Sequence, residues 1–385
     1  MQRESAVFVR TWRHCLVGTL LFCLCGQAFG QVDVEHRRLL TLQSGMSVYH
    51  SEEALDGYGF FWFNEDHFPW DRTALRLNYA GIYLDGELSY FLPLPTVTAI
   101  GIRLGGGVYS DDMHPYVQGE RIASQEFDGD SGLVSVFINH EIGKIAGQLP
   151  VNIRATYQAR RTDYRKTGHT SDFVLPPNFF THTVQGEFRL GGLEREITSR
   201  RGLVAYVLAD ANYRDDFRAF GPVGALFPAY SDYQRLLAQL GARIPIDKTT
   251  WFLLFTGGTG HHLDELSAYQ LGGNLVNADP TIYTLHGYYT KEFFVRDFGL
   301  VNFEVRQEIN EQHHMTLHLY ADCAAERSVP PDGSAKRILP GVGTGIGFQT
   351  FWKTDVLLSY GYGFNAVRNG DRGGHEVALG IERKF

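Results

Sequence analysis

Polar and apolar residues alternate one by one along several stretches of this chain of 385 residues. In the stretch 151–160 the odd positions hold Val, Ile, Ala, Tyr and Ala, and the even positions hold Asn, Arg, Thr, Gln and Arg; the stretch 180–190 repeats the pattern. Successive side chains of a β-strand point to opposite faces, so each stretch predicts a strand with one apolar and one polar face. This pattern suits a strand that has lipid on one side and water on the other.

The same sequence excludes membrane helices. No stretch after residue 30 approaches 18 uninterrupted apolar residues, and a closed β-barrel is then the only structure that can span a bilayer. The 27 Phe, 20 Tyr and 43 Gly are many for a soluble domain, whereas the mean hydropathy of −0.19 is that of a polar one. A barrel with a lipid face and a wet lumen reconciles the two. We therefore predict an all-β fold, a transmembrane antiparallel β-barrel.

The first thirty residues have the composition of an export signal. Three arginines lie within the first 13 residues, an apolar stretch follows over 15–25, and Ala28 and Gly30 are small residues at the positions a signal peptidase reads. The apolar stretch is too short for a transmembrane helix, which needs about 20 residues. We predict a signal peptide over 1–30, a single barrel domain over 31–385, and the bacterial outer membrane as its location.

Cysteine usage and charge narrow the class further. Three of the four cysteines lie within 1–30, so Cys323 alone remains and the mature chain forms no internal disulfide. Acylation at Cys23 or Cys25 is a less favoured alternative, because bulky residues precede them. The net charge of the whole chain is −8, and the signal peptide carries a net positive charge, so the mature part is still more acidic. Binding of nucleic acid is excluded, because it requires a basic surface.

The alternation and the turn residues together predict sixteen strands, with a tight hairpin turn at Asp85-Gly86. The connections 109–130, 163–179, 214–230 and 365–374 are long, whereas 246–249 and 351–353 are short. Outer-membrane barrels have short periplasmic turns and long outer loops, so we expect the chain to end in the periplasm. The predicted strands lie near 37–48, 57–63, 72–84, 86–92, 97–108, 131–142, 150–162, 180–192, 202–213, 231–244, 249–259, 300–309, 315–323, 340–350, 354–364 and 375–385.

Four motifs in the carboxyl-terminal half occur in a characteristic order. They are Ser199–Gly202, the segment Tyr269–Gly273 with Leu271, Gly272 and Gly273, the segment Leu285, His286, Gly287 and Tyr288, and the strand pair Phe303–Arg306 and Leu319–Asp322. In this order they resemble the barrel of the bacterial surface antigen family, which includes the outer-membrane assembly barrels BamA and TamA. The resemblance implies that the loop after Gly273 folds into the lumen with its tip at Leu285–Tyr288.

In that family the loop tip carries an arginine that contacts acidic residues in the lumen. Here His286 takes its place, and an imidazole is shorter, lacks the bidentate fork and titrates near neutral pH. Strand parity predicts that Glu304, Arg306 and Asp322 all point into the lumen. We hypothesise that His286 contacts Asp322 or Glu304 and anchors the loop. In the alternative interpretation, Gly287 makes a surface turn and His286 is solvated.

The resemblance implies a role in outer-membrane protein assembly, insertion or translocation. Its implied partners are outer-membrane lipid, client outer-membrane proteins and a separate periplasmic docking protein, because only 31–37 precede the first predicted strand and leave no room for the periplasmic POTRA domains of the family. A passive pore or structural barrel is the alternative. The end of the last strand, Phe385 with Ile381 and Leu379 on one face, fits the signal for insertion of such barrels, although Arg383 interrupts that face.

Enzyme chemistry finds no support in the sequence. The adjacent pairs His261-His262 and His313-His314 cannot chelate a metal from one strand face, because neighbouring side chains on a strand point to opposite sides. No G-x-S-x-G or comparable signature accompanies the remaining histidines. We predict that the protein is not an enzyme and that it has no cofactor, metal site or catalytic residue. An outer-membrane hydrolase would require turnover that a single Ser or His exchange abolishes.

Overall fold

The computed structural model of the chain describes residues 36–47, 56–80, 83–117, 119–145, 149–190, 202–228, 230–273, 282–312, 314–329 and 336–385. The predicted signal peptide lies outside these residues, and so do Ser199–Arg201 of the first motif. No helix among the described residues is long and apolar enough to cross a membrane. The described elements are strands and one 3-10 turn, Ala123–Gln125.

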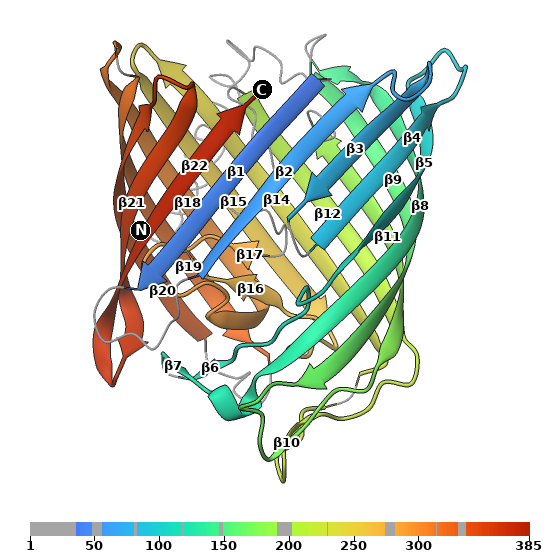
Figure 1. Cartoon of the computed structure of the whole chain (residues 1–385), viewed down its shortest axis with the longest axis vertical. Coiled ribbons are helices and arrows are strands. Elements are labelled where there is room, and N and C mark those ends of the chain that lie inside the picture. Colours follow the sequence, from blue (N-terminus) through green and yellow to red (C-terminus); the bar gives the residue numbers. More distant parts are fainter. Residues whose placement is uncertain are drawn as a thin grey trace, which may run out of the picture.

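Sixteen strands of the described chain form the wall of a barrel (Figure 1). The main sheet has eighteen strands, and two of them, β16 (Tyr269–Leu271) and β17 (Ile282–Tyr283), belong to the connection between β15 and β18. Each wall strand pairs antiparallel with its neighbours in the chain, and β22 pairs with β1, which joins the first strand to the last. The all-β barrel prediction is thereby confirmed.

The wall strands in chain order are β1 (His36–Ser47), β2 (Asp56–Asp66), β3 (Thr73–Tyr79), β4 (Tyr83–Phe91), β5 (Thr98–Gly107), β8 (Phe127–Ile145), β9 (Leu149–Lys166), β11 (Phe179–Leu190), β12 (Gly202–Arg214), β14 (Asp232–Ile246), β15 (Thr249–His261), β18 (Phe293–Asn310), β19 (Met315–Ser328), β20 (Lys336–Gln349), β21 (Thr354–Arg368) and β22 (Asp371–Lys384).

The alternation seen in the sequence separates the two faces of this wall. On β8, Val134 and Val136 are 49% and 50% exposed on the outer face, whereas Ser135 between them is 2% exposed on the lumen face. Exposed aromatic side chains gather at both ends: Trp70 near one rim, and Tyr213 near the other. Apolar outer strands between two aromatic belts are the surface that a bilayer requires.

Two predicted turns are wrong. Asp85-Gly86 lies inside β4, where Asp85 accepts hydrogen bonds from Arg103 on β5, and the chain reverses instead between Tyr79 and Tyr83. The predicted long loop 365–374 is a tight hairpin, because β21 continues to Arg368 and β22 begins at Asp371. Asn369 and Gly370 form that turn with φ of 51° and 85°, as an Asn-Gly pair in a type I′ turn requires. Strand β18 also starts seven residues before the predicted strand at 300–309.

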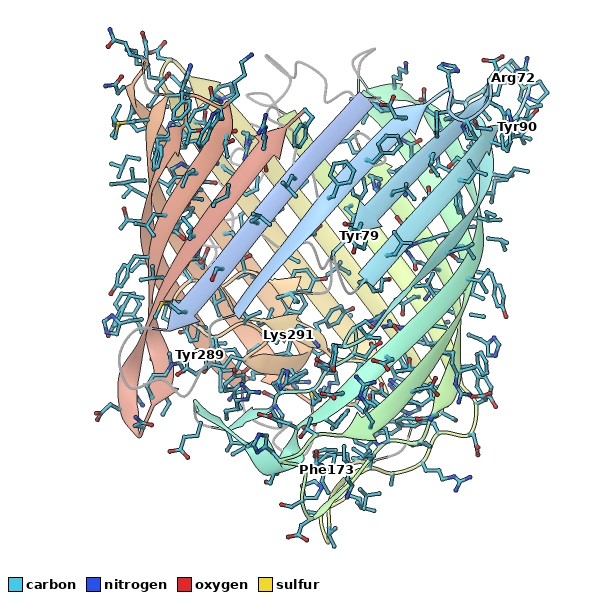
Figure 2. The ribbon with its side chains drawn as sticks, in the orientation of Figure 1. Arg72, Tyr79, Tyr90, Phe173, Tyr289 and Lys291 are labelled. Carbon is cyan, nitrogen blue, oxygen red and sulfur yellow. The ribbon has the colours of Figure 1, made fainter. Side chains whose placement is uncertain are left out.

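The long connections gather at one end of the barrel, the lower end in Figure 1. They contain the short strands β6 (Tyr116–Val117), β7 (Glu120–Arg121), β10 (Phe173–Val174) and β13 (Gly221–Pro222). Figure 2 shows Phe173 at this end, and Tyr90 at the opposite end. A buried cluster holds the long connections together, and its members are Met113, Phe127, Phe173, Phe220 and Phe227. The loops at this end therefore form a packed cap over the barrel.

The wall has an uneven height. Strands β8 and β9 are 19 and 18 residues long, whereas β3 and β4 have 7 and 9 residues. The ladder between β2 and β3 runs only from Phe61 to Asp66 on β2, six paired residues, while the ladder between β1 and β22 has nine. Figure 1 shows β3 and β4 ending partway down the barrel, above the level that β8 and β9 reach.

Candidate functional site

The connection between β15 and β18 folds into the lumen and is the candidate site. Its first part ends with β16, which pairs antiparallel with β18, and Gly272 and Gly273 follow with φ of 128° and 94°. Gly273 donates its N–H to Tyr288 O at 2.9 Å, and Leu285 donates its N–H to Gly273 O at 3.1 Å. The predicted loop start, Leu271–Gly273, therefore lies directly beside the predicted tip. A Cβ on Gly272 would lie 2.0 Å from Tyr289 O, so only glycine fits this crossing.

The tip places His286 against Asp322 on β19. The backbone N–H of His286 donates to Asp322 Oδ2 at 3.0 Å, and its Nδ1 contacts the same oxygen. Asn302 on β18 donates to the other carboxylate oxygen at 2.7 Å. The imidazole also stacks on Tyr320, with centroids 4.3 Å apart. His286 and Asp322 are 6% and 5% exposed, so a buried carboxylate receives hydrogen bonds from the loop and from the wall.

Glycines of the wall receive the backbone of the tip. A Cβ on Gly341 of β20 would lie 2.4 Å from His286 O. On the next two strands, a Cβ on Gly363 of β21 would lie 2.7 Å from Gly287 O, and one on Gly374 of β22 would lie 2.4 Å from the same oxygen. Gly287 itself has a φ of 81°. The tip thus touches β20, β21 and β22 by backbone contacts that larger residues would prevent.

Tyrosine side chains extend this contact. Tyr288 donates its hydroxyl hydrogen to Pro340 O at 2.9 Å and accepts the N–H of Asn365 at 3.3 Å. Tyr288 and Tyr289 are 0% and 1% exposed. Figure 2 shows Tyr289 with Lys291 near the lower end of the barrel. Burial raises the pKa of the Tyr288 phenol above its usual value. This phenol therefore stays protonated and remains a hydrogen-bond donor.

Two buried ion pairs fix the ends of the connection to the wall. Glu292 binds Arg368 of β21 in a bidentate pair with both distances 2.9 Å, and the guanidinium lies 3.5 Å from the ring centroid of Tyr289. At the other end, Asp264 pairs with Arg214 of β12, and both side chains are at most 2% exposed. Breaking one partner of such a pair leaves a buried charge, which is strongly destabilising. The connection is consequently tied to opposite parts of the wall.

Glu304 and Arg306 belong to a different cluster from His286. Glu304 Oε1 contacts Nδ1 of His318 at 2.9 Å and accepts a hydrogen bond from Arg306 at 3.1 Å. Of the two acids considered from the sequence, Asp322 is the one that His286 contacts. The cluster around Glu304 lies further along β18 and β19, toward the end with short turns.

The predicted insertion signal occupies the outer face at the end of β22. Leu379 and Phe385 are 40% and 65% exposed, and Ile381 shares their parity. Leu379 pairs with Ser44 and Ile381 with Leu42 of β1. The Arg383 guanidinium lies 5.0 Å from the Phe385 ring centroid.

The sequence did not single out a second polar region of the lumen. On the wall formed by β3, β4, β5 and β9, Glu87 contacts Arg76 and Arg154, each at 2.7 Å, and Asp85 accepts hydrogen bonds from Arg103. Glu87 is 5% exposed. The polar and charged residues at the even positions of 152–160 indicated a face in contact with water. Their ion-pair partners could not be predicted, because they come from strands that are distant in sequence. Arginines and carboxylates therefore form a row across this part of the lumen.

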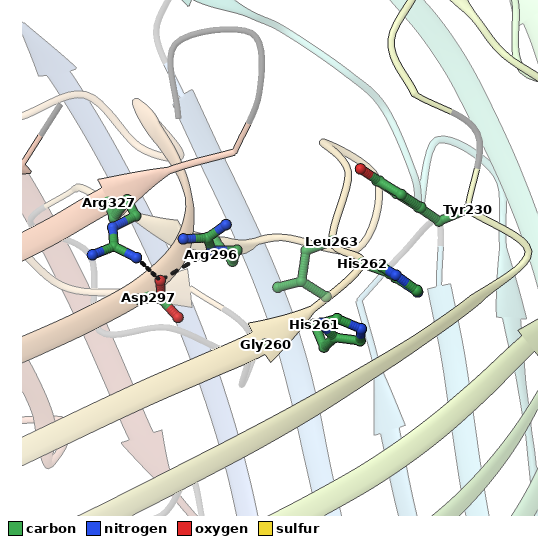
Figure 3. A pocket seen from close by; sticks show the side chains of 8 residues that line it. All are labelled: Tyr230, Gly260, His261, His262, Leu263, Arg296, Asp297 and Arg327. Atoms are coloured by element: carbon green, nitrogen blue, oxygen red, sulfur yellow. Dashed lines mark hydrogen bonds and ion pairs between the residues drawn. The ribbon is translucent and has the colours of Figure 1, made fainter. Parts of the chain in front are cut away.

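One cavity opens at the end of the barrel that carries the long connections, between the ends of β14, β15, β18 and β19 (Figure 3). Its lining residues are Tyr230, Gly260, His261, His262, Leu263, Arg296, Asp297 and Arg327. No group of three or more His, Cys, Asp or Glu residues in the described chain could hold a metal ion.

The comparisons with known proteins support the fold. No family profile and no curated protein matches this sequence. Among solved structures, CdiB from Acinetobacter baumannii has a TM-score of 0.61 and 12% identity, and the match covers 91% of this chain and 60% of that one. BamA from Haemophilus ducreyi lacking POTRA domains 1–3 has a TM-score of 0.56 and 12% identity, and the match covers 89% of this chain and 70% of that one. CdiB from Escherichia coli has a TM-score of 0.52 and 11% identity, and the match covers 89% of this chain and 63% of that one.

This chain is therefore a bacterial outer-membrane β-barrel whose fold is that of the BamA and CdiB barrels. It spans less than two thirds of the length of either CdiB chain.

Proposed function

We propose that this barrel acts in the assembly or translocation of outer-membrane proteins. The observation that carries the proposal is the position of the loop tip. Gly287 packs against Gly374 of β22, the strand that pairs with β1. The tip therefore supports the wall from inside, beside the junction of the first and last strands. Moving it would remove the inner packing of β22 and make that junction easier to open.

An opened junction exposes two strand edges that can pair with an incoming strand. Unpaired backbone groups cannot remain in a bilayer, so an edge freed there recruits another strand. A client outer-membrane protein that offers its own strand would meet this requirement by strand addition. Outer-membrane lipid surrounds the wall, and a separate periplasmic docking protein would deliver the client. The likeness of the fold to BamA and CdiB barrels is consistent with this role.

A lock across the junction tests the proposal. Ser44 of β1 and Leu379 of β22 are paired and share the outer face, so cysteines at both positions form a disulfide in a Cys323→Ala background. The matched control places cysteines at Leu240 and Phe255, a paired outer position between β14 and β15. We expect vesicles with the reduced barrel to accelerate client folding, the junction lock to abolish the acceleration, and the control lock to leave it. Acceleration that survives the junction lock would refute the strand-pairing role.

A selective pore is the second candidate, and the row of arginines and carboxylates on β3, β4, β5 and β9 favours it. Charged rows on a lumen wall set the selectivity of outer-membrane pores. Conductance in planar bilayers tests this function: a pore gives steady currents whose ion selectivity changes on Arg154→Gln, and client folding is then unaffected by the barrel. Absence of conductance under these conditions would exclude the pore.

A further inference from the structure

The cavity in Figure 3 lies at the end of the wall that carries the long connections. His261 and Thr259 on β15, Asp297 on β18 and Arg327 on β19 take the outward parity of their strands. Further along the same outer face, Phe255 and Leu319 are 48% and 49% exposed. Long loops mark this end as the outer one. We therefore place this part of the outer face at the level of the outer leaflet.

Two guanidinium groups share one carboxylate in this cavity. Arg296 Nε and Arg327 Nη1 donate to the same oxygen, Asp297 Oδ2, at 3.0 and 3.3 Å, and Thr259 donates to the other oxygen at 2.7 Å. One negative charge thus holds two positive charges close together. Both arginines are about one third exposed, so the fork of donors on each guanidinium reaches the open cavity of about 360 Å³. This arrangement attracts an additional anion, and a phosphate matches the geometry of two arginine forks.

Flat rings form the other side of the cavity. The sequence reasoning that His261 and His262 point to opposite sides does not hold here, because β15 ends at His261 and His262 has a φ of 56°. Their rings stack with centroids 3.9 Å apart, and Tyr230 stacks on His262 at 4.9 Å with an angle of 3° between the planes. Asp232 contacts His262 Nδ1 at 3.2 Å. Figure 3 shows these rings across Leu263 from the arginine pair. Flat rings next to hydrogen-bonding groups suit a sugar ring, which has apolar C–H faces and hydroxyl edges.

The wall next to the cavity leaves room for an acyl chain. Gly257, Gly299 and Ala325 are paired across β15, β18 and β19, two residues from Thr259, Asp297 and Arg327 on the same outer face. A Cβ on Gly299 would meet nothing within 4 Å. This shallow part of the outer surface begins where the polar groups end, as a lipid with a polar head requires. A soluble anion has no acyl chain that could pack on this apolar surface.

We propose that this cavity binds the phosphorylated sugar headgroup of an outer-leaflet glycolipid. The arginine pair binds the phosphate, and the stacked rings of Tyr230, His262 and His261 contact the sugar. The surface over Gly257, Gly299 and Ala325 accommodates the start of an acyl chain. Such a lipid would hold the barrel at a fixed depth and orientation in the outer leaflet, which goes beyond the proposed role in assembly.

Opposite charge changes at the cavity test the proposal. Removing both guanidiniums in Arg296→Gln/Arg327→Gln should lower retention of lipid A, measured by native mass spectrometry after exchange into detergent, by at least about tenfold, a change of about 1.4 kcal/mol. Asp297→Asn leaves both arginines without their shared carboxylate and should raise retention. A purely structural role for the cluster predicts a loss of retention in both variants. Arg218→Gln is the matched control, because Arg218 is a loop arginine with a 74% exposed side chain.

Four outcomes would overturn the proposal. The first is equal lipid A retention in the double glutamine variant and in Arg218→Gln. The second is a loss of retention in Asp297→Asn that matches the loss in the double variant. The third is full displacement of lipid A by inorganic phosphate alone at millimolar concentration, which would identify a site for a free anion. Retention of phosphatidylglycerol equal to that of lipid A would show that the ring stack does not recognise a sugar, and would overturn the headgroup assignment.

Discussion

Replacing Gly341 by alanine tests whether backbone contact holds the loop tip in the lumen. The new Cβ would lie 2.4 Å from His286 O, whereas an ordinary contact between carbon and oxygen needs about 3.3 Å. The backbone of the tip must therefore retreat by about 1 Å. That shift lengthens the hydrogen bond from His286 N–H to Asp322, now 3.0 Å, beyond bonding distance. We expect overpacking and a weakened buried hydrogen bond to cost about 1–3 kcal/mol of loop attachment.

The rate of cleavage by chymotrypsin at Tyr288 and Tyr289 reports this cost directly. Both tyrosines are buried, so cleavage requires release of the tip, and each 1.4 kcal/mol raises the released population about tenfold. We expect cleavage of folded Gly341→Ala in micelles to be about 5 to 100 times faster than cleavage of the unchanged protein. The gel mobility of heated and unheated samples shows whether the barrel itself is folded.

Two glycine controls separate loop release from weakening of the wall. Gly345 belongs to the same lumen-facing row of β20. The three atoms nearest to a Cβ there all belong to β21, and the nearest is Leu358 O at 3.1 Å. A Cβ on Gly299, on the outer face of β18, would meet nothing within 4 Å. Cleavage of Gly341→Ala no faster than cleavage of Gly345→Ala would refute the reasoning.

Three further predictions address the anchor, the pH dependence and a turn. His286→Ala removes a partner of buried Asp322, so we expect attachment to weaken by about 1–3 kcal/mol with faster chymotrypsin cleavage, and unchanged cleavage would refute the anchor. Burial, together with the neighbouring Asp264, raises the pKa of Glu265 to about 8. Because this folded pKa exceeds the usual value of 4.5, loop stability should fall as pH rises from about 4.5 to about 8, and Glu265→Gln should flatten that fall; an unchanged pH profile of cleavage would contradict it. Gly370→Ala, at φ 85°, should lower the free energy of unfolding by about 1 kcal/mol, whereas Gly186→Ala, with nothing within 4 Å, should not.

Strand parity alone predicted most of the fold, because the side-chain period of a strand is fixed by its geometry. It correctly predicted that Glu304 and Asp322 lie on the lumen face. Turn chemistry was less reliable, since Asp85-Gly86 and Asn369-Gly370 carry similar local signals. The strand register distinguishes the two. Asp85 lies opposite Gly105 and accepts a hydrogen bond from Arg103 on the neighbouring strand, so it belongs to a ladder. Arg368 and Asp371 are paired with each other, so only Asn369 and Gly370 are left to form the turn between them.

The candidate site was predictable only in part, because its contacts join residues far apart in the chain. The alternate glycines of β20 were visible in the sequence, but nothing local says that a loop packs on Gly341 and not on Gly345. The pairing of Arg214 with Asp264 spans 50 residues, and no periodic pattern encodes such a pair. His286 contacts Asp322 and not Glu304, because Glu304 already forms a hydrogen bond with His318.

The short strands β3 and β4 have a consequence for the surrounding bilayer. Seven residues of β3 extend about 24 Å along the strand, and at a tilt of about 40° they reach only about 18 Å along the membrane normal. The apolar band of such barrels is about 25 Å tall. Lipids beside this part of the wall must thin by several ångströms to meet it, at a cost of a fraction of a kcal/mol per ångström. One side of the barrel thus faces a strained, thinner bilayer than the side formed by the long strands β8 and β9.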